Sequence, residues 1–313
     1  MLKENQNINR KLAGVFAPII TPFNDEEIIF EELRDNISKY NLTDLKGYMP
    51  LGSNGEYQGL TEEESLKILD IVQKYKSAGK IIVAGCGRES AKATVEFIKK
   101  AVSVGLDFAF VLTPHYFVKE MTDDALFKYF IYIADKSPIP IIIYNAPKFA
   151  FDLLISPDLV GRLSVHPNII AMKNSSLFPI SEYKKYISKN TDFHLLAGNV
   201  KTFYHGLING AIGAVLSTAS YLPEYCCKLY QLYADKNYDE AEKLHNFLND
   251  LSDNTVGKFG VPGVKFGMDL RGFFGGNPRL PLLPLKLSDK EHIIEYFKSH
   301  GITKFNQINI KWV

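Results

Sequence analysis

Eight short apolar runs recur between residues 14 and 217, and longer stretches with mixed apolar and polar positions separate them. The runs are Gly14–Ile20, Gly47–Leu51, Ile81–Ala84, Asp107–Leu112, Ile139–Tyr144, Ile169–Lys173, Phe193–Ala197 and Ala211–Ser217. Most consist of Val, Ile, Phe, Ala and Leu without strict alternation. This pattern predicts parallel strands that are buried on both faces.

Residues typical of helix N-termini occur between the apolar runs. Thr61 and Glu64 are spaced as a capping box before a helix over Ser65–Tyr75, and a proline follows the N-cap candidate Ser156. Two further N-caps precede helices of their own: Ser90 before Ala91–Val104, and Thr122 before Asp123–Lys136. Eight strand–helix repeats predict an α/β fold, the (β/α)8 TIM barrel. An open doubly wound sheet is the competing architecture.

A dinucleotide-binding open sheet is expected to carry G-x-G-x-x-G after its first strand. The nearest match, Gly85-Cys-Gly-Arg-Glu-Ser90, lacks the third glycine and follows the third run. The sequence contains no phosphate-loop pattern either. Both observations favour the barrel.

The pattern changes after residue 217. Leu222–Tyr233 and Asp239–Leu251 have the spacing of amphipathic helices, and Gly257–Pro284 repeats glycine and proline. Ser288 to Glu291 has the spacing of a second capping box, which predicts a last helix that ends near Lys298. We therefore predict a catalytic barrel in residues 1–222 and a C-terminal helical extension in residues 223–313.

Composition narrows the possible partners. The chain has 313 residues, with 36 Lys and Arg against 35 Asp and Glu, so no nucleic acid or anionic membrane is expected to bind it. No apolar run approaches the roughly 20 residues of a membrane helix, and Met1–Lys11 lacks the apolar core of a signal peptide. The three cysteines make no disulfide framework. We expect a cytoplasmic protein.

Chemistry in such a barrel lies at the carboxyl ends of the strands. Lys173 closes the sixth run, after the apolar stretch that ends at Met172. Burial there disfavours the charged amine and lowers its pKa, and a neutral amine can attack a ketone to form a Schiff base. The alternative is a lysine that extends to solvent or pairs with an acid from another strand.

Two other run ends carry candidate groups. Tyr144 closes the preceding run, so we expect it beside Lys173, where a phenol can transfer a proton; the alternative is a buried tyrosine with a satisfied hydroxyl. The small-residue turn Gly52–Gly55 precedes a capped helix. Its backbone N–H groups can bind a carboxylate, or it is an ordinary turn.

The sequence gives little support for a metal-dependent enzyme or a serine hydrolase. The seven histidines show no H-E-x-x-H motif, and only His115 and His194 stand near predicted strands, so no metal is predicted. Gly52-Ser-Asn-Gly55 does not match the G-x-S-x-G turn of serine hydrolases.

Five motifs together indicate a family. They are Thr21-Pro-Phe23, Gly52-Ser-Asn-Gly-Glu56, Thr113-Pro-His-Tyr116, Tyr144-Asn-Ala-Pro147 and Met172-Lys-Asn-Ser175. In this order and spacing the chain resembles, over nearly its whole length, the class I aldolases of the dihydrodipicolinate synthase and N-acetylneuraminate lyase family. Within the family it is most similar to 4-hydroxy-2-oxoglutarate aldolase, on the segments Ala84–Ser90, His166–Ile170, Leu195–Gly198 and Phe259–Lys265.

The resemblance implies three catalytic side chains. Lys173 matches the Schiff-base lysine, and Tyr144 matches the tyrosine that transfers protons. Tyr116 matches a tyrosine that reaches into the site of a neighbouring subunit, so the resemblance implies a homo-oligomer, either a dimer or a tetramer of tight dimers.

The resemblance also implies five substrate-binding positions. Ser53 and Asn54 stand where the family holds the carboxylate of pyruvate. Ser175 and Gly198 stand where the oxoglutarate aldolases contact the far end of the substrate. Val215 matches the position whose carbonyl faces the substrate.

The activity implied is the cleavage of a 2-keto acid to pyruvate and an aldehyde without metal or organic cofactor, with 4-hydroxy-2-oxoglutarate giving pyruvate and glyoxylate. Ser53 and Asn54 replace two threonines of dihydrodipicolinate synthases. Phe149 replaces an arginine that binds a second carboxylate there, although Lys148 precedes it. The alternatives are a synthase-type condensation of pyruvate with an aldehyde, an aldolase for 2-keto-3-deoxy sugar acids, and a non-catalytic barrel that senses a keto acid.

Overall fold

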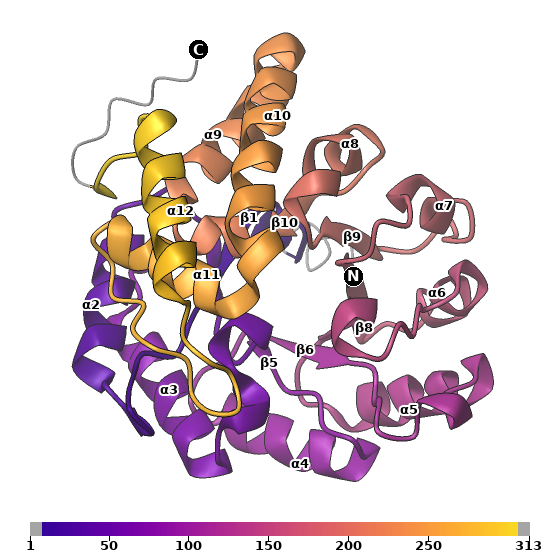
Figure 1. Ribbon diagram of the computed structural model, residues 1–313. Coiled ribbons are helices and arrows are strands. Elements are labelled where there is room, and N and C mark those ends of the chain that lie inside the picture. Colours follow the sequence, from indigo (N-terminus) through magenta and orange to yellow (C-terminus); the bar gives the residue numbers. More distant parts are fainter. Residues whose placement is uncertain (1–7, 306–313) are drawn as a thin grey trace. The chain divides into compact units, whose positions relative to one another are not determined.

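The computed structural model describes residues 8–305 (Figure 1). Within this range eight parallel strands close into a barrel, in the order β1-β10-β9-β8-β7-β6-β5-β4. The predicted (β/α)8 TIM barrel is therefore confirmed. The strands are β1 (Gly14–Pro18), β4 (Gly47–Met49), β5 (Ile81–Gly85), β6 (Phe108–Leu112), β7 (Ile141–Asn145), β8 (Ile169–Asn174), β9 (His194–Ala197) and β10 (Gly213–Val215).

Each predicted run coincides with one strand, and their ends differ by no more than two residues. Nearly every residue of these strands is buried, which explains why the runs are continuous and not alternating. A short antiparallel hairpin of β2 (Phe23–Asn24) and β3 (Glu27–Ile28) was not predicted, because two-residue strands leave no periodic signal.

Helices follow the strands, and a C-terminal helical group comes last, as predicted. Those between the strands are α2 (Phe30–Asn41), α3 (Glu62–Tyr75), α4 (Ala91–Val102), α5 (Asp123–Lys136), α6 (Pro157–Leu163), α7 (Ile180–Lys184) and α8 (Phe203–Ile208). The C-terminal helices are α9 (Pro223–Ala234), α10 (Tyr238–Asn254), α11 (Val256–Leu270) and α12 (Leu287–Ser299).

Four predicted N-caps form as expected. The Thr61 hydroxyl accepts the Glu64 N–H at 3.1 Å, and the Glu64 carboxylate accepts the Thr61 N–H at 2.8 Å. The hydroxyls of Ser90, Thr122 and Ser156 likewise accept N–H groups of the first turn of their helices. Such caps satisfy backbone donors that have no acceptor inside the helix.

One C-terminal prediction needs correction, and one helix there was not predicted. The capping box at Ser288 is wrong: Lys286 is the N-cap of α12, its carbonyl accepts the Lys290 N–H, and Ser288 already lies in the first turn. The glycine-rich stretch after residue 256 holds a helix, α11, that propensity alone would not indicate. Gly260 breaks this helix with φ 61°, so Pro262 begins the second half, where a missing N–H costs no hydrogen bond.

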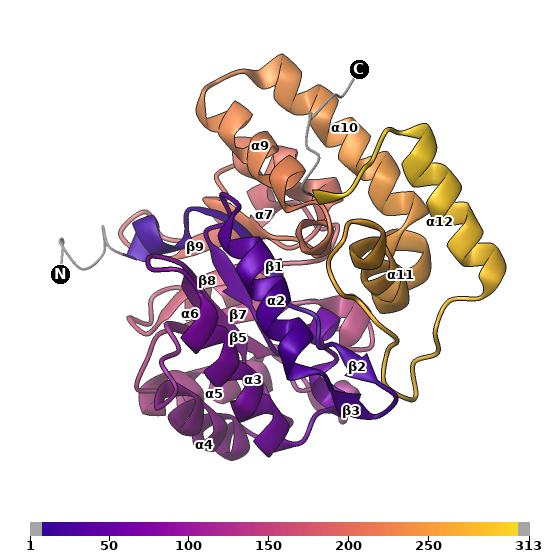
Figure 2. The same ribbon diagram turned by 90° about the vertical axis from the view of Figure 1, so that its left-hand side faces the viewer.

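The described chain consists of two compact units. One contains Ile81–Val215 and the described part of Met1–Gly14; its helices α4–α8 follow one another along the outer side of its strands (Figure 1). The other contains Val15–Lys80 and the described part of Leu216–Val313. In it α10 packs against α9 and α11, and α12 contacts both α10 and α11 (Figure 2).

The predicted domain boundary between residues 222 and 223 stays a prediction. The outer ends of both predicted domains, and most of the polar segment Met1–Lys11, lie outside the described residues. Among residues 8–305, no helix has the length and apolar character needed to cross a lipid bilayer. All three cysteines are buried and free.

Candidate active site

Lys173 and Tyr144 occupy paired positions on adjacent strands. β7 and β8 are parallel, and their register sets Tyr144 opposite Lys173. The Lys173 Nζ lies 4.2 Å from the centre of the Tyr144 ring and 5.8 Å from that of Phe110 on β6. Rings from two consecutive strands thus flank the amine that the third strand carries.

The surroundings of Lys173 favour its neutral form. Lys173 is 4% exposed, which differs from a lysine that extends to solvent. Burial lowers the pKa of the Lys173 amine, while the charge of Tyr144 and a side-chain hydrogen bond to it act in the opposite direction. The net lowering increases the fraction of amine that carries a lone pair for attack on a carbonyl.

Two asparagines that the sequence analysis did not single out fix the ends of these strands. Asn145 directly follows Tyr144, and Asn174 directly follows Lys173; both are buried. The Asn145 amide donates to Asn174 Oδ1 at 2.9 Å and to the Tyr183 hydroxyl at 3.0 Å, and its oxygen accepts the Ile155 N–H at 3.2 Å. An amide closing an otherwise apolar strand was the signal that could have identified them.

Ser175 and Gly198 meet at the ends of β8 and β9. The Ser175 hydroxyl donates to the Gly198 carbonyl at 3.1 Å, and the Gly198 N–H donates to the Asn174 carbonyl at 2.7 Å. A Cβ on Gly198 would collide with the Ser175 Oγ and the Asn174 backbone, so only glycine permits this approach. Val215, the last residue of β10, is buried.

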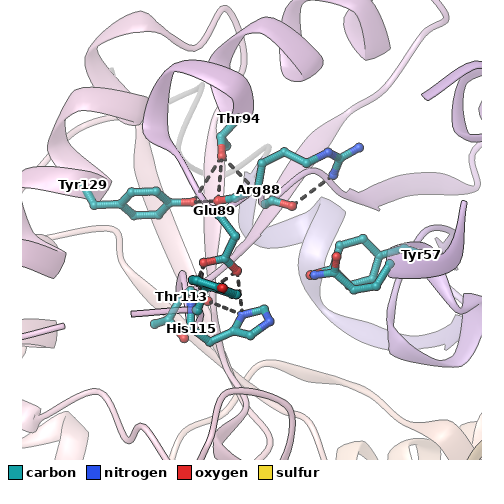
Figure 3. A network of polar contacts seen from close by, with 10 residues as sticks. Tyr57, Arg88, Glu89, Thr94, Thr113, His115 and Tyr129 are labelled. Carbon is teal, nitrogen blue, oxygen red and sulfur yellow. Dashed lines mark hydrogen bonds and ion pairs between the residues drawn. The ribbon is translucent and has the colours of Figure 1, made fainter. Parts of the chain in front are cut away.

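Tyr116 lies on the loop after β6 and is 77% exposed, with its ring edge-on to Phe117 at 4.9 Å. Glu89, from the loop after β5, holds this loop (Figure 3). Its carboxylate accepts the N–H of His115 at 3.0 Å and of Tyr116 at 2.9 Å, and lies 3.1 Å from His115 Nδ1. The sequence analysis did not single out Glu89, because its partners are distant in sequence.

The backbone that carries Glu89 is itself anchored. The Tyr129 hydroxyl donates to the Arg88 carbonyl at 2.8 Å, and the Thr94 hydroxyl accepts the Arg88 N–H at 3.0 Å (Figure 3). The Arg88 guanidinium lies 3.9 Å from the centre of the Phe97 ring. The Glu89 carboxylate therefore projects from a fixed support.

We expect Glu89→Ala to loosen the loop that carries Tyr116, because the backbone N–H groups of His115 and Tyr116 lose their acceptor. Trypsin should then cut after the exposed Lys119 about fivefold faster than in the unchanged protein, as followed by mass spectrometry. Glu96→Ala is the matched control, since Glu96 is exposed and pairs with Lys92 on the same helix. Equal cleavage rates in both variants would contradict this role of Glu89.

Ser53 and Asn54 form a 3-10 turn, η1 (Ser53–Gly55), that follows β4. The Asn54 amide donates to the Ser220 Oγ at 3.4 Å, and its oxygen accepts from the Ser217 hydroxyl at 3.2 Å. The Ser53 Oγ is buried, and residues 8–305 offer it no hydrogen-bond partner. A buried hydroxyl without a partner is costly, so this atom is suited to a bound polar group.

The loop after β7 is apolar. Phe149 is 42% exposed and Phe151 is 73% exposed, and the ring of Phe151 lies 6.2 Å from that of His115. Lys148 is exposed beside them. In the described part of the chain, no three His, Cys, Asp or Glu side chains gather in a way that could hold a metal ion.

The model of the dihydrodipicolinate synthetase family matches residues 11–299. The chain is 32% identical to the 4-hydroxy-tetrahydrodipicolinate synthase of Methanothrix thermoacetophila over 275 residues, which are 87% of this chain and 91% of that protein. It is 28% identical to an L-threo-3-deoxy-hexylosonate aldolase of Hypocrea jecorina over 287 residues, with the same two shares.

Solved structures agree with the sequence relatives. The dihydrodipicolinate synthase from Aquifex aeolicus superposes with a TM-score of 0.86 at 26% identity, over 94% of this chain and 99% of that chain. A catalytic lysine mutant of the Ruminococcus gnavus sialic acid aldolase shares the fold, with a TM-score of 0.82 over 92% of this chain and 95% of that chain. The chain belongs to the dihydrodipicolinate synthetase family.

Proposed function

We propose that this protein is a class I aldolase that reversibly cleaves a 2-keto acid to pyruvate and an aldehyde through a Schiff base on Lys173. Its family contains synthases and aldolases, and the enzyme is accordingly a carbon–carbon lyase. The observation that carries the proposal is the buried amine of Lys173, with a lowered pKa, directly beside the phenol of Tyr144.

The proposed reaction has three stages: formation of an iminium ion, cleavage of the C3–C4 bond and release of pyruvate. The Lys173 amine attacks C2 of the keto acid to form a carbinolamine. Tyr144 donates a proton to the departing hydroxyl, so that loss of water leaves an iminium ion and the Tyr144 phenolate. The electron pair of the breaking C3–C4 bond moves into the iminium to form an enamine, while Tyr144 takes the proton of the C4 hydroxyl and the aldehyde leaves. Protonation at C3 and addition of water release pyruvate and return the free amine.

We assign the carboxylate of the keto acid to Ser53 and Asn54. The Ser53 Oγ, which has no hydrogen-bond partner among residues 8–305, supports this assignment, because a carboxylate would accept its proton. The hydrogen bonds of the Asn54 side chain to Ser220 and Ser217 fix the turn directly after Ser53. Val215 is proposed to contribute its backbone carbonyl at the end of β10.

We propose 4-hydroxy-2-oxoglutarate as the substrate, with glyoxylate as the aldehyde product. The resemblance of the sequence to 4-hydroxy-2-oxoglutarate aldolase supports this choice. So does the contact between Ser175 and Gly198, the two residues that the resemblance assigns to the far end of the substrate. Phe149 cannot supply the bidentate contact to a second carboxylate that an arginine makes, which argues against a synthase-type condensation. A 2-keto-3-deoxy sugar acid is the second candidate, because the Hypocrea jecorina relative is a deoxy-hexylosonate aldolase.

We also propose that the protein acts as a homo-oligomer, a dimer or a tetramer, in which Tyr116 completes the site of a neighbouring subunit. The exposure of the Tyr116 and Phe117 rings and the clamp of Glu89 on their loop support this arrangement, since neighbouring large aromatic side chains on a surface are typical of contact sites.

Sodium borohydride with pyruvate tests the mechanism. We expect the iminium to be reduced to a stable secondary amine, with one pyruvate-derived group on Lys173 identified by peptide mass spectrometry. Omitting pyruvate is the control. Absence of any adduct would rule out the Schiff base, and an adduct without turnover of any substrate would favour a keto-acid sensor.

A panel of substrates then identifies the aldehyde. Cleavage is measured by coupling pyruvate formation to lactate dehydrogenase, with 4-hydroxy-2-oxoglutarate and 2-keto-3-deoxy sugar acids compared at equal concentration. We expect kcat/KM for 4-hydroxy-2-oxoglutarate to exceed that for the sugar acids by at least about tenfold. A preference for a sugar acid would replace the proposed substrate and keep the mechanism.

A further inference from the structure

A buried lysine on α11 lies among three acceptors that are distant from each other in sequence. The Lys265 Nζ donates to the carbonyl of Thr21 at 2.9 Å and to that of Asn277 at 2.8 Å, and it forms an ion pair with Glu56 Oε1 at 2.6 Å. An ammonium group has three N–H donors; two of them have carbonyl acceptors here, and the Glu56 carboxylate lies at ion-pair distance. The proposed reaction does not use this lysine.

Glu56 is the residue that ends the turn carrying Ser53 and Asn54. It adopts the left-handed conformation, with φ 55°, which is uncommon for a side chain other than glycine. Its second oxygen accepts the Arg279 N–H at 2.8 Å. Both carboxylate oxygens are therefore held by the segment that runs from α11 to Arg279.

The residue before Glu56 is held as well. The Thr21 hydroxyl donates to the Gly55 carbonyl at 2.7 Å, and Lys265 binds the carbonyl of the same threonine. A Cβ on Gly55 would lie 2.9 Å from the Ile19 carbonyl, so the turn packs tightly against the segment after β1. Lys265 thus contacts both Glu56, which ends the turn, and Thr21, which binds the Gly55 carbonyl.

Stability alone gives little reason for this ion pair. Both side chains are buried, and burial lowers the pKa of Lys265, while the charge of Glu56 raises it. Removing two charges from water costs about as much as their attraction returns, so a buried pair is often no more stable than apolar side chains. The ion pair instead fixes the position of Glu56 relative to Lys265.

We propose that Lys265 and Glu56 are positioning residues that fix the Gly52–Glu56 turn so that Ser53 can bind the carboxylate of the keto acid. They lower the pyruvate concentration that half-saturates the protein, and they leave the rate of the chemistry at Lys173 largely unchanged. This inference rests on the proposed function, because it presumes that pyruvate bonds to Lys173.

The test measures the rate of borohydride trapping on Lys173 as a function of pyruvate concentration. Lys265→Met removes the ammonium, and Glu56→Gln keeps an oxygen for the Arg279 N–H while removing the charge. We expect the half-saturating pyruvate concentration to rise about tenfold in Lys265→Met and about threefold in Glu56→Gln. The trapping rate at saturating pyruvate should stay within about twofold of the unchanged protein.

Arg271→Met is the matched control for lost stability. Arg271 is also buried on α11's C-terminal side, where it pairs with the buried Glu224 and donates to the Tyr221 carbonyl. Its removal leaves a carboxylate unpaired, as Lys265→Met does, but touches no residue of the Gly52–Glu56 turn. We expect a lower Tm in both variants and an unchanged half-saturating concentration in Arg271→Met only.

The outcomes separate the two proposals. If the unchanged protein forms no adduct with pyruvate, the proposed function fails. If it forms the adduct and Glu56→Gln traps with the same concentration dependence, the positioning role is wrong, whether or not Lys265→Met folds. An equal rise in Arg271→Met would also overturn it, since the effect would then follow from stability.

Discussion

Replacing Lys173 by methionine is expected to lower kcat for keto-acid cleavage by at least about a thousandfold, because no other group in the proposed mechanism can form the iminium. The pyruvate adduct should disappear from the borohydride reaction at the same time. Methionine has nearly the length of lysine and keeps the contacts with the Tyr144 and Phe110 rings. The variant therefore removes the amine and preserves the packing.

The same variant is expected to be as stable as the unchanged protein or more stable. Burial lowers the pKa of Lys173 in the fold, whereas an unfolded lysine has a pKa of about 10.4. Unfolding therefore takes up a proton between these two pKa values. Below the folded pKa both states are charged, and the fold bears the full free-energy cost of burying the ammonium. This cost shrinks as the pH rises above the folded pKa, and it vanishes above the unfolded pKa, so the stability of the fold increases with pH in this range.

Thermal unfolding at pH 7 and pH 10.5 measures this difference. We expect Lys173→Met to have a Tm equal to or above that of the unchanged protein at pH 7, with the difference shrinking at pH 10.5. Lys243→Met, at an exposed lysine that pairs with Glu240, is the control and should alter neither turnover nor Tm. Near-normal turnover in Lys173→Met would refute the Schiff-base mechanism.

Tyr144→Phe is expected to lower kcat about a hundredfold, because it removes the phenolic hydroxyl that transfers protons and keeps the ring. The ring packs 6.0 Å from Phe110 and 4.2 Å from the Lys173 Nζ, so the pocket around the amine should persist. The half-saturating concentration of pyruvate should change less than about threefold, since binding precedes proton transfer. Steady-state kinetics and borohydride trapping measure the two quantities.

Tyr221→Phe is the matched control. Its hydroxyl is buried and lies 2.6 Å from Thr255 Oγ1, so losing it should cost about 1 kcal/mol of stability. We expect no comparable loss of turnover. If the two variants lost turnover equally, the effect of Tyr144 would be structural and its catalytic role would be wrong.

Local patterns in the sequence were enough for most of the fold. Buried parallel strands need continuous apolar runs, and all eight runs became strands. Thr61 and Ser90 cap helices because a cap needs only a side chain and the N–H groups two or three residues later. Ser288 failed because the same spacing also occurs inside a first turn, and only the path of the chain before α12 decides which residue is the cap.

The helix α11 shows where composition misleads. Its glycines lower helix propensity by roughly 1 kcal/mol each relative to alanine, yet two of them allow close packing. Gly267 lies against the Tyr221 ring, where a Cβ would come within 3.3 Å, and a Cβ on Gly263 would approach the Thr255 carbonyl at 3.0 Å. At Gly267 tertiary contact outweighed propensity, because its partner Tyr221 belongs to a segment distant in sequence.

The candidate site likewise has residues that the sequence pattern predicted and contacts that only the structure revealed. The strand pattern alone put Lys173 and Tyr144 at the ends of consecutive parallel strands, because short βα units make consecutive strands neighbours. The contacts of Glu89 and Lys265 came only from the tertiary structure. The same holds for the buried Ser53 hydroxyl, which has no hydrogen-bond partner within residues 8–305. A periodic pattern reports which face of an element is buried, whereas the partner of a polar atom depends on which distant segments the fold brings together.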